Sequence, residues 1–530
     1  MERIRKKLRA LRFDDPPSDF ELLETEHGQP GFFGGWRDMR VEEPEEDGPV
    51  APSVAQEEAR WKKACRGAIN PDLILRRFHI GGRVKAMAVF VNGMADGDAI
   101  AEFILRPAMR EGCLEGAEGE LAAFCVQHVF TMQEAVLVES RRDLQRAVLE
   151  GQTAVYIEGC TRAVVMDTRG FPSRSVGTPQ NEVVILGPHE AFTENIRTNV
   201  SLLRRIIKTD DFVCEFRASG GRNNNRIAIA YRQGVANRSL VHEVKRRFAS
   251  VDTLMVLSIG TLEQLTEKNS FAPVPQSLST ERPDRVAAHI MQGRVAVLLE
   301  GSPLVSVVPA TLFMLMSSGE DAYLRQPIGT VIRLVRYIGA FLSVIMPAYF
   351  LALALHHQGM LSGEVLATVI ASRNMVFLPL GAEMLFLLVV FQLVREAGLA
   401  LPGAMGQSIG IIGGLILGQA AVSANIVSQF VLITVALTGL GNFAIPDYNL
   451  QLAAVYYRIF LLLLAWIGGL LGLACALVLT VAYMASLKSY GVPFLAPISP
   501  KTHSKGSWIL RGVVRDSRRP SDVNNTEARA

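Results

Sequence analysis

The sequence predicts an α/β or α+β cytoplasmic region of two subdomains, followed by a polytopic α-helical membrane domain. The chain has no Asp, Glu, Lys or Arg from Ala397 to Pro446, and none from Ile459 to Leu487. A helix needs roughly 20 apolar residues to cross the hydrocarbon core of a bilayer. Before residue 300, short apolar runs ended by turn residues alternate with helical patterns, which is typical of α/β or α+β units.

Composition and charge exclude several function classes. The net charge is only +3, which gives no reason to expect nucleic-acid binding. The six cysteines stand singly, without a CxxC pair, so neither a disulfide framework nor a metal site is expected. Residues 1–13 are basic, but no apolar segment of the kind found in a signal peptide follows them. These residues fit either an amphipathic helix on an anionic membrane or a solvated basic tail.

We expect five segments along the chain. Residues 1–59 form a disordered tail with a possible basic helix at its start, because they are rich in acidic residues and proline. Residues 60–175 form the first cytoplasmic subdomain, and residues 176–300 form the second with its linker. Residues 301–490 form the membrane domain with five or six helical segments, and residues 491–530 form a C-terminal tail.

In the polar half, apolar runs that end in turns predict the strands. The expected strands are Met87–Val91, Ala154–Ile157, Ala163–Asp167, Val183–Leu186, Phe212–Phe216, Arg226–Tyr231 and Val295–Leu299. The expected helices are Asp98–Met109 (interrupted at Pro107), Thr193–Lys208 and Leu240–Phe248. The recurring strand-plus-glycine pattern predicts two related subdomains that meet near residues 170–179.

The membrane half divides into candidate crossings. They are Tyr337–Leu355, Met375–Val394, Met405–Ala424, Asn425–Ile445 and Ile459–Met484. The uncharged segment Gly301–Ser318 contains two prolines and is expected to be a broken or re-entrant element. Five crossings place the basic C-terminal tail outside, whereas six place the arginines at 325–336 outside. The positive-inside rule does not decide between them.

Glycines at four-residue spacing predict close helix packing in the membrane. They are Gly410, Gly414 and Gly418 in one run and Gly468 with Gly472 in another. The same spacing serves packing within one chain or a contact between subunits.

Glu383 is the most informative single residue, because it lies inside a predicted crossing, where a charge is costly. It either lines a path for ions or substrate, or pairs with Arg373 or Arg395, or is buried in protonated form. Uncharged polar residues add to it: Gln407, Gln419, Asn425 and Gln429. They either line the same path or form hydrogen bonds between helices. No phosphate loop, zinc spacing or nucleophile elbow is present, so no catalytic residue, metal or cofactor is predicted and the chain is not expected to be an enzyme.

Several segments resemble the bacterial spore germination receptor A-subunit (GerA) family. They are Thr193–Asn199, Leu202–Lys208, Pro273–Gln276, Thr280–Asp284, Gly293–Ala296, Arg395–Gly398, Gly410–Ser423 and Gly491–Pro497. Within them the motif residues are Glu194, Asn195, Arg197, Asn199, Glu281, Arg282, Pro283 and Asp284. The resemblance spans roughly residues 60 to 500. The chain departs from the family at Val274, where an aromatic residue is usual, and at Ala322 and Ala400, where Tyr and Arg are common.

The resemblance implies a multi-pass protein of the spore inner membrane whose N-terminal region faces the cytoplasm. It implies partnership with B and C receptor subunits, and a homo-oligomer through the membrane domain that passes cations and triggers germination. The family also contains paralogues that amplify germination without sensing nutrients. From the residues themselves, a secondary transporter or a non-conducting scaffold are the alternatives.

Overall fold

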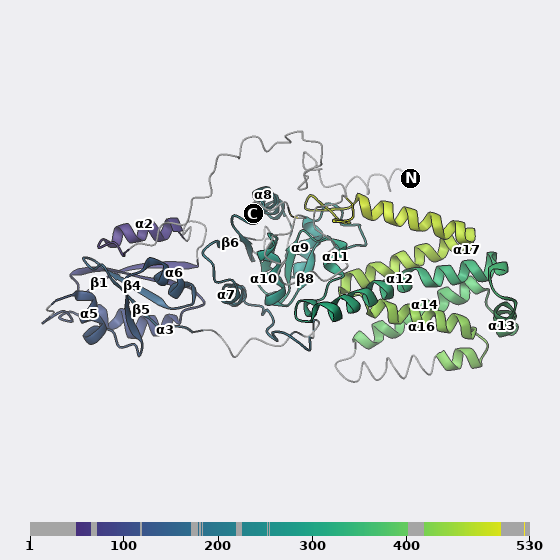
Figure 1. Ribbon diagram of the computed structural model, residues 1–530, viewed down its shortest axis with the longest axis horizontal. Coiled ribbons are helices and arrows are strands. Elements are labelled where there is room, and N and C mark those ends of the chain that lie inside the picture. The colour runs from purple at the N-terminus through teal and green to yellow at the C-terminus, as the bar shows by residue number, and fades with distance from the viewer. Residues whose placement is uncertain are drawn as a thin grey trace, which may run out of the picture.

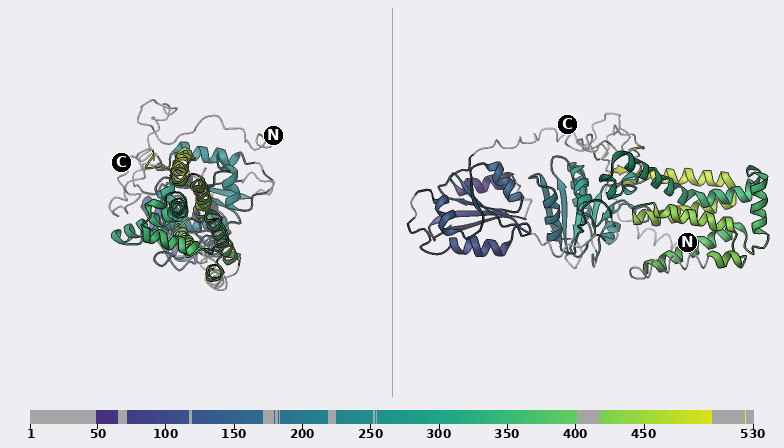
Figure 2. Two further views of the ribbon diagram at one scale, coloured as in Figure 1. Left: turned by 90° about the vertical axis from the view of Figure 1, so that its right-hand side faces the viewer. Right: turned by 60° about the horizontal axis from the view of Figure 1, so that its bottom comes forward.

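The computed structural model describes residues 49–64, 72–116, 119–170, 179, 182, 184–218, 225–251, 253, 255–400, 418–499 and 524. Two α/β subdomains and a bundle of long helices follow one another along the length of the molecule (Figure 1). The second subdomain lies between the first and the bundle in Figure 1 and in the right-hand view of Figure 2.

The first subdomain is a five-stranded antiparallel sheet in the order β1-β2-β4-β5-β3. Its strands are Leu73–Ile80, Val84–Val91, Ala135–Val138, Thr153–Ile157 and Ala163–Met166 for β1 to β5. Helices α2 (Val54–Ala64) and α6 (Arg141–Leu149) cover one face. Short helical segments cover the other: α3 (Gly97–Ala99), η1 (Ile100–Leu105), α4 (Arg106–Ala108), α5 (Leu121–Phe124) and η2 (Cys125–Val129). Alternate strand residues point to opposite sides of a sheet, so each face packs against its own layer of helices and both faces are buried.

The second subdomain repeats this architecture with the strand order β6-β7-β9-β10-β8. Its strands are Phe212–Ala218, Arg226–Arg232, Leu278–Thr280, Val295–Leu299 and Val305–Val308 for β6 to β10. Helices α7 (Ile196–Ile206) and α10 (Pro283–Met291) cover one face, and α8 (Arg238–Ala249) and α9 (Ile259–Thr266) the other. The two successive sheets therefore have the same strand order.

The bundle contains α12 (Gln326–His356), α13 (Gly363–Arg373), α14 (Leu380–Ala400), α16 (Gln429–Phe443) and α17 (Tyr448–Ser486). Within the described ranges, α12 and α17 are long and apolar enough to cross a membrane, and α16 is a shorter apolar helix. Helix α17 bends at Gly469, whose φ of 59° and ψ of −140° are not helical. Its two arms, residues 448–468 and 470–486, run in opposite directions (Figure 1).

Short elements connect the second subdomain to the bundle. They are α11 (Leu312–Leu315), η3 (Gly319–Ala322), β11 (Lys488–Ser489) and β12 (Val492–Pro493), while η4 (Gln358–Met360) lies at the far end of the bundle. Residues that follow α17 return to the sheet: the Ser489 hydroxyl accepts a hydrogen bond from the Ala310 amide at 2.9 Å. The second subdomain is therefore built from two separate parts of the chain.

Four expectations about individual segments were wrong. Gly301–Ser318 is no membrane element: it contains β10 and α11 of the second subdomain, so the bundle begins near Gln326 rather than at residue 301. Residues 184–186 form no strand. The first helix continues through Pro107, because proline is tolerated in the first turn of α4. Ile459–Met484 is not one straight crossing, since it contains the bend at Gly469.

Contacts define the two ends of the bundle. We call the end beside the second subdomain proximal and the opposite end distal. At the distal end His356 Nε2 lies 2.9 Å from the Trp466 carbonyl oxygen, and a Cβ on Gly381 would meet the Trp466 ring. At the proximal end Arg395 donates to the Gln451 side chain at 2.6 Å. Helices α12, α14 and α17 therefore share both ends.

Candidate functional sites at the subdomain junction and in the bundle

The motif at the start of α7 joins the two subdomains. Asn195 caps the helix, because its side-chain oxygen accepts from the amides of Arg197 and Thr198. Asn199 is buried and fixes the preceding turn by donating to the Thr193 carbonyl at 2.6 Å. One turn further on, buried Arg204 donates to Asp72 at the start of β1. Asn195 and Asn199 thus stabilise the start of α7, and Arg204 near its end joins the subdomains.

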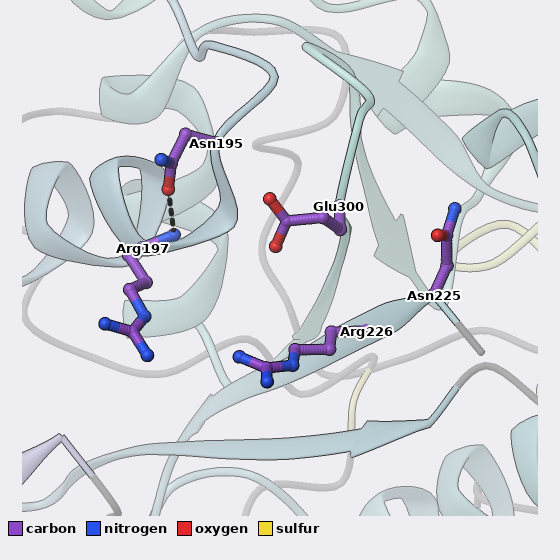
Figure 3. Close-up of a pocket in the computed structure, with 5 residues that line it drawn as sticks. All are labelled: Asn195, Arg197, Asn225, Arg226 and Glu300. Atoms are coloured by element: carbon purple, nitrogen blue, oxygen red, sulfur yellow. Dashed lines mark hydrogen bonds between the residues drawn. The ribbon is translucent and has the colours of Figure 1, made fainter.

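An open, charged pocket of about 470 Å³ lies beside this helix start (Figure 3). It is lined by Asn195, Arg197, Asn225, Arg226 and Glu300. The two guanidinium groups and the Glu300 carboxylate point toward the same space (Figure 3). Such a combination can bind a small molecule that has an anionic group and an ammonium group.

The first subdomain shows a different arrangement at the equivalent place. Glu158, like Glu300, follows the fourth strand of its sheet and precedes a glycine. The Glu158 carboxylate accepts from the Val54 amide at the start of α2 at 2.9 Å and so fills the helix start. In the second subdomain Asn195 caps α7 instead, and the helix start stands beside the open pocket.

The Thr-Glu-Arg-Pro-Asp motif connects the second subdomain to the start of the bundle. Arg282 is fully buried and donates to Asp284 at 2.7 Å, and Asp284 accepts from the Tyr323 hydroxyl at 2.5 Å. Burial and the Asp284 carboxylate raise the pKa of Tyr323 to about 12. Glu281 accepts from the Glu182 amide at 2.8 Å, and Pro283 begins α10. The dense charges of this turn therefore form a structural joint.

A buried carboxylate orients the first turns of α12. Asp321 is 2 % exposed and accepts from Arg333 at 3.0 Å and from Arg336 at 2.7 Å. Two arginines inside a long apolar helix are thereby neutralised where the helix leaves the second subdomain. This geometry places their charges at the proximal end.

Glu383 lies in the first turn of α14, at the distal end, rather than in the middle of a helix. It is fully buried and accepts from both the amide and the hydroxyl of Ser428, at 2.5 and 2.6 Å. Arg373 Nε lies 3.7 Å from its second carboxylate oxygen. The side chain thus connects the ends of α13 and α14 to the start of α16. Arg373, one of its two predicted arginine partners, is the one it meets.

Three of the four uncharged polar candidates lie at the same end of the bundle as Glu383. Gln419, Asn425 and Gln429 are exposed on the surface of the chain around the distal turn before α16, and Asn425 adopts a positive φ of 54°. Gln407 lies outside the described residues. The structure therefore brings three of these polar groups to the distal end and does not arrange them along the interior of the bundle.

Of the predicted packing glycines, some lie outside the described residues and the others differ in what surrounds them. Gly410 and Gly414 lie outside the described residues, while a Cβ on Gly418 would touch Leu432 at 3.4 Å. A Cβ on Gly472 would meet the Leu464 carbonyl of the same chain at 2.1 Å, and one on Gly468 would meet nothing within 4 Å. Gly472 thus allows the two arms of α17 to approach each other at the bend, and this close contact lies within one chain.

One buried polar cluster inside the bundle was not predicted from the sequence. Arg458 of α17 donates to the Ser343 carbonyl of α12 at 2.7 Å and to Asn442 of α16 at 3.0 Å. A signal was present, since Arg458 stands directly before a long uncharged run and Pro347 stands inside another. As for metals, the described residues hold no group of three or more His, Cys, Asp or Glu side chains placed to bind one.

Comparisons with known proteins agree on one family. The model of the Bacillus/Clostridium GerA spore germination protein family matches residues 60–522. Spore germination protein KA of Bacillus subtilis is 32 % identical over 90 % of this chain and 88 % of its own length. Spore germination protein B1 of the same organism is 33 % identical, over 85 % and 94 %. The N-terminal domain of the A subunit of the Bacillus megaterium germinant receptor GerK3 is 25 % identical, with a TM-score of 0.40, over 50 % of this chain and 98 % of that domain.

Proposed function

We propose that this chain, which belongs to the Bacillus/Clostridium GerA spore germination protein family and is a subunit of a spore germinant receptor, spans the membrane six times and conducts cations as a homo-oligomer. In this proposal it assembles with B and C receptor subunits in the spore inner membrane, with both subdomains in the cytoplasm.

The direction of each helix supports six crossings. Helices α12 and α14 and the two arms of α17 connect the proximal and distal ends, and α16 runs from the distal end toward the proximal one. Ala400 ends α14 proximally and Ser428 begins α16 distally, as the predicted crossing Met405–Ala424 requires, although most of that segment lies outside the described residues. Six crossings bring the C-terminal tail and the arginines of α12 to one side. The positive-inside rule is then satisfied both for the basic C-terminal tail and for the arginines of α12.

The polar groups at the distal turn carry the conduction proposal. Asn425 and Gln429 are exposed on a surface that is otherwise dominated by large apolar side chains. In the six-crossing topology these amide groups lie at the distal surface of the membrane, where water reaches them. Copies of the chain arranged around a shared path would place them at its mouth.

Chemical modification tests this proposal. Asn425→Cys and Gln429→Cys, each in a chain with Cys475→Ser, are reconstituted in liposomes with the partner subunits. A water-soluble thiol reagent should label both positions and change cation flux. Val478→Cys, exposed on the second arm of α17, is the control that should stay unlabelled. Flux that is unchanged by full labelling at 425 and 429 would remove these residues from the path.

Two other functions are tested by the same preparation. A secondary transporter would show saturable flux without discrete current steps. A germination-amplifying member of the family would conduct without any response to nutrients.

The charged pocket beside α7 supports a second activity, binding of a small zwitterion or anion. Its support is the contrast with Glu158, which fills the equivalent helix start in the first subdomain. Titration calorimetry with a panel of amino acids and with inorganic phosphate tests it on the full chain. Binding that is lost in Arg226→Gln supports the pocket, and binding unaffected by that change would place the ligand elsewhere.

A further inference from the structure

Three helices meet at a buried polar cluster, the Arg458 node, which consists of Arg458, Ser343 and Asn442. The Arg458 guanidinium donates to the Ser343 carbonyl at 2.7 Å, to the Ser343 hydroxyl at 2.5 Å and to the Asn442 carboxamide at 3.0 Å. All three side chains are at most 3 % exposed. Among the described ion pairs, none joins a carboxylate to Arg458, so neutral oxygens alone hold this cation.

Pro347 explains why the carbonyl of Ser343 is available. In a helix this carbonyl would accept from the amide four residues later, but proline has no amide hydrogen. A buried carbonyl without a donor is costly. Arg458, from a different helix, supplies the donor that α12 lacks.

The node lies between the apolar core of the second subdomain and two apolar cores of the bundle. On the proximal side, α12 residues up to Val344 and α17 residues up to Tyr457 pack into the core of the second subdomain. On the distal side, α12 from Ala348 and α17 from Leu461 pack into two cores of the bundle, and Val344 and Ile345 of α12 also contact one of these. Pro347 of α12 and Arg458 of α17 lie where the packing of each helix changes from the core of the second subdomain to the cores of the bundle.

A close helix crossing lies one turn from the node. A Cβ on Gly441 of α16 would be 2.4 Å from the Gly339 carbonyl of α12 and 3.1 Å from the Ser343 amide. Two backbones in direct contact provide a pivot without bulky side chains that would have to be displaced.

We propose that the Arg458 node is the latch of a hinge in the bundle. The proximal half moves with the second subdomain, the distal half moves as a separate body, and α12 bends at Pro347 when Arg458 releases the Ser343 carbonyl. Hinges concentrate at a few residues, and a proline is a common cause of a helix bend. The latch holds the two halves in their present arrangement, whether or not the bundle conducts ions.

A distance measurement on the full chain in lipid nanodiscs tests the latch. Nitroxide labels replace Phe271 in the second subdomain and Met360 at the distal end, both well exposed, in a chain with Cys475→Ser. With the labelled chain diluted into an excess of unlabelled chain, so that an oligomer carries at most one labelled copy, electron–electron double resonance should show one narrow distance peak. Arg458→Gln should abolish that single peak and give a broad distribution. Adding Pro347→Ala should restore the narrow peak, because alanine has the amide hydrogen that the Ser343 carbonyl needs as its helical donor.

The control is Arg395→Gln, which removes another bundle arginine, bonded to Gln451 and not to Ser343 or Asn442, and should leave the peak unchanged. A narrow peak in Arg458→Gln would overturn the proposal, and so would broadening that persists in the double variant. If Arg458→Gln does not fold, Arg458→Lys keeps the charge and loses the forked donor, so it should broaden the peak and recover with Pro347→Ala.

Discussion

Arg204 of α7 donates to Asp72 at the start of β1, and this buried pair joins the two subdomains. The exposed fractions of the two side chains are 6 % and 7 %. The Arg204 guanidinium also lies 5.1 Å from the centre of the Phe212 ring. The buried Arg204–Asp72 pair therefore joins the two subdomains, together with the more exposed Lys208–Glu150 pair at 3.7 Å.

Replacing one partner of this pair should strongly destabilise the junction. Asp72→Ala leaves a buried guanidinium without its counter-charge, which costs about 3–5 kcal/mol. Thermal unfolding of the solubilised chain measures the loss. The exposed pair Arg106–Glu102 provides the control, since Arg106→Ala should change stability by less than about 1 kcal/mol. Equal effects of the two variants would show that the Asp72 pair does not hold the subdomains together.

Gly441→Ala should disrupt the crossing of α12 and α16. The added Cβ would lie 2.4 Å from the Gly339 carbonyl, which is backbone and does not move aside easily. We expect a loss of about 1–3 kcal/mol or failure to fold. Melting temperature and yield in detergent measure it. Gly468→Ala is the control, because its Cβ meets nothing within 4 Å. A Gly441→Ala chain as stable as that control would contradict the close crossing.

Glu383→Ala should loosen the distal end of the bundle. The change leaves the buried amide and hydroxyl of Ser428 without their acceptor, at a cost of about 1–3 kcal/mol. Glu383→Gln retains an acceptor oxygen and should be milder in thermal unfolding. The cation flux of Glu383→Gln then separates the two roles: altered flux in a stable oligomer supports the path, and normal flux leaves Glu383 as a structural connection.

Glu267 should give the second subdomain a pH-dependent stability. Burial, reinforced by the nearby Glu263 carboxylate, raises the pKa of Glu267 to about 7. The folded state therefore binds more protons than the unfolded state between the normal glutamate pKa and pH 7, so stability falls as pH rises through this window. The loss is on the order of 1–3 kcal/mol between pH 5 and 8. Unfolding curves of Glu267→Gln should lack this slope; an unchanged slope would assign it to another group.

The fold was predictable where local pattern and environment agree. Met87–Val91, Ala154–Ile157 and Val295–Leu299 are strands, because apolar runs ended by turns are buried in both sheets. The prediction for Gly301–Ser318 was wrong because an uncharged run is typical of a buried strand and turn as well as of a membrane segment. The bend of α17 was not predicted because the glycine itself is the only sign in the sequence of the positive φ at Gly469.

The candidate sites were less predictable than the fold. The Arg458 node depends on the register of three helices, since Arg458 and Ser343 are 115 residues apart in sequence. Glu383 was recognised as a costly charge, but its contact with Ser428 depends on the turn before α16. Sequence identifies such residues as unusual, and only the packing of helices identifies their partners.

Cation current from the purified chain, reconstituted with its B and C partner subunits, tests the central claim most directly. We expect discrete, cation-selective currents that appear with germinant and change when Asn425→Cys or Gln429→Cys is modified. A verified oligomeric complex that binds germinant yet passes no cations would contradict it, and would leave the membrane helices with a role in assembly alone.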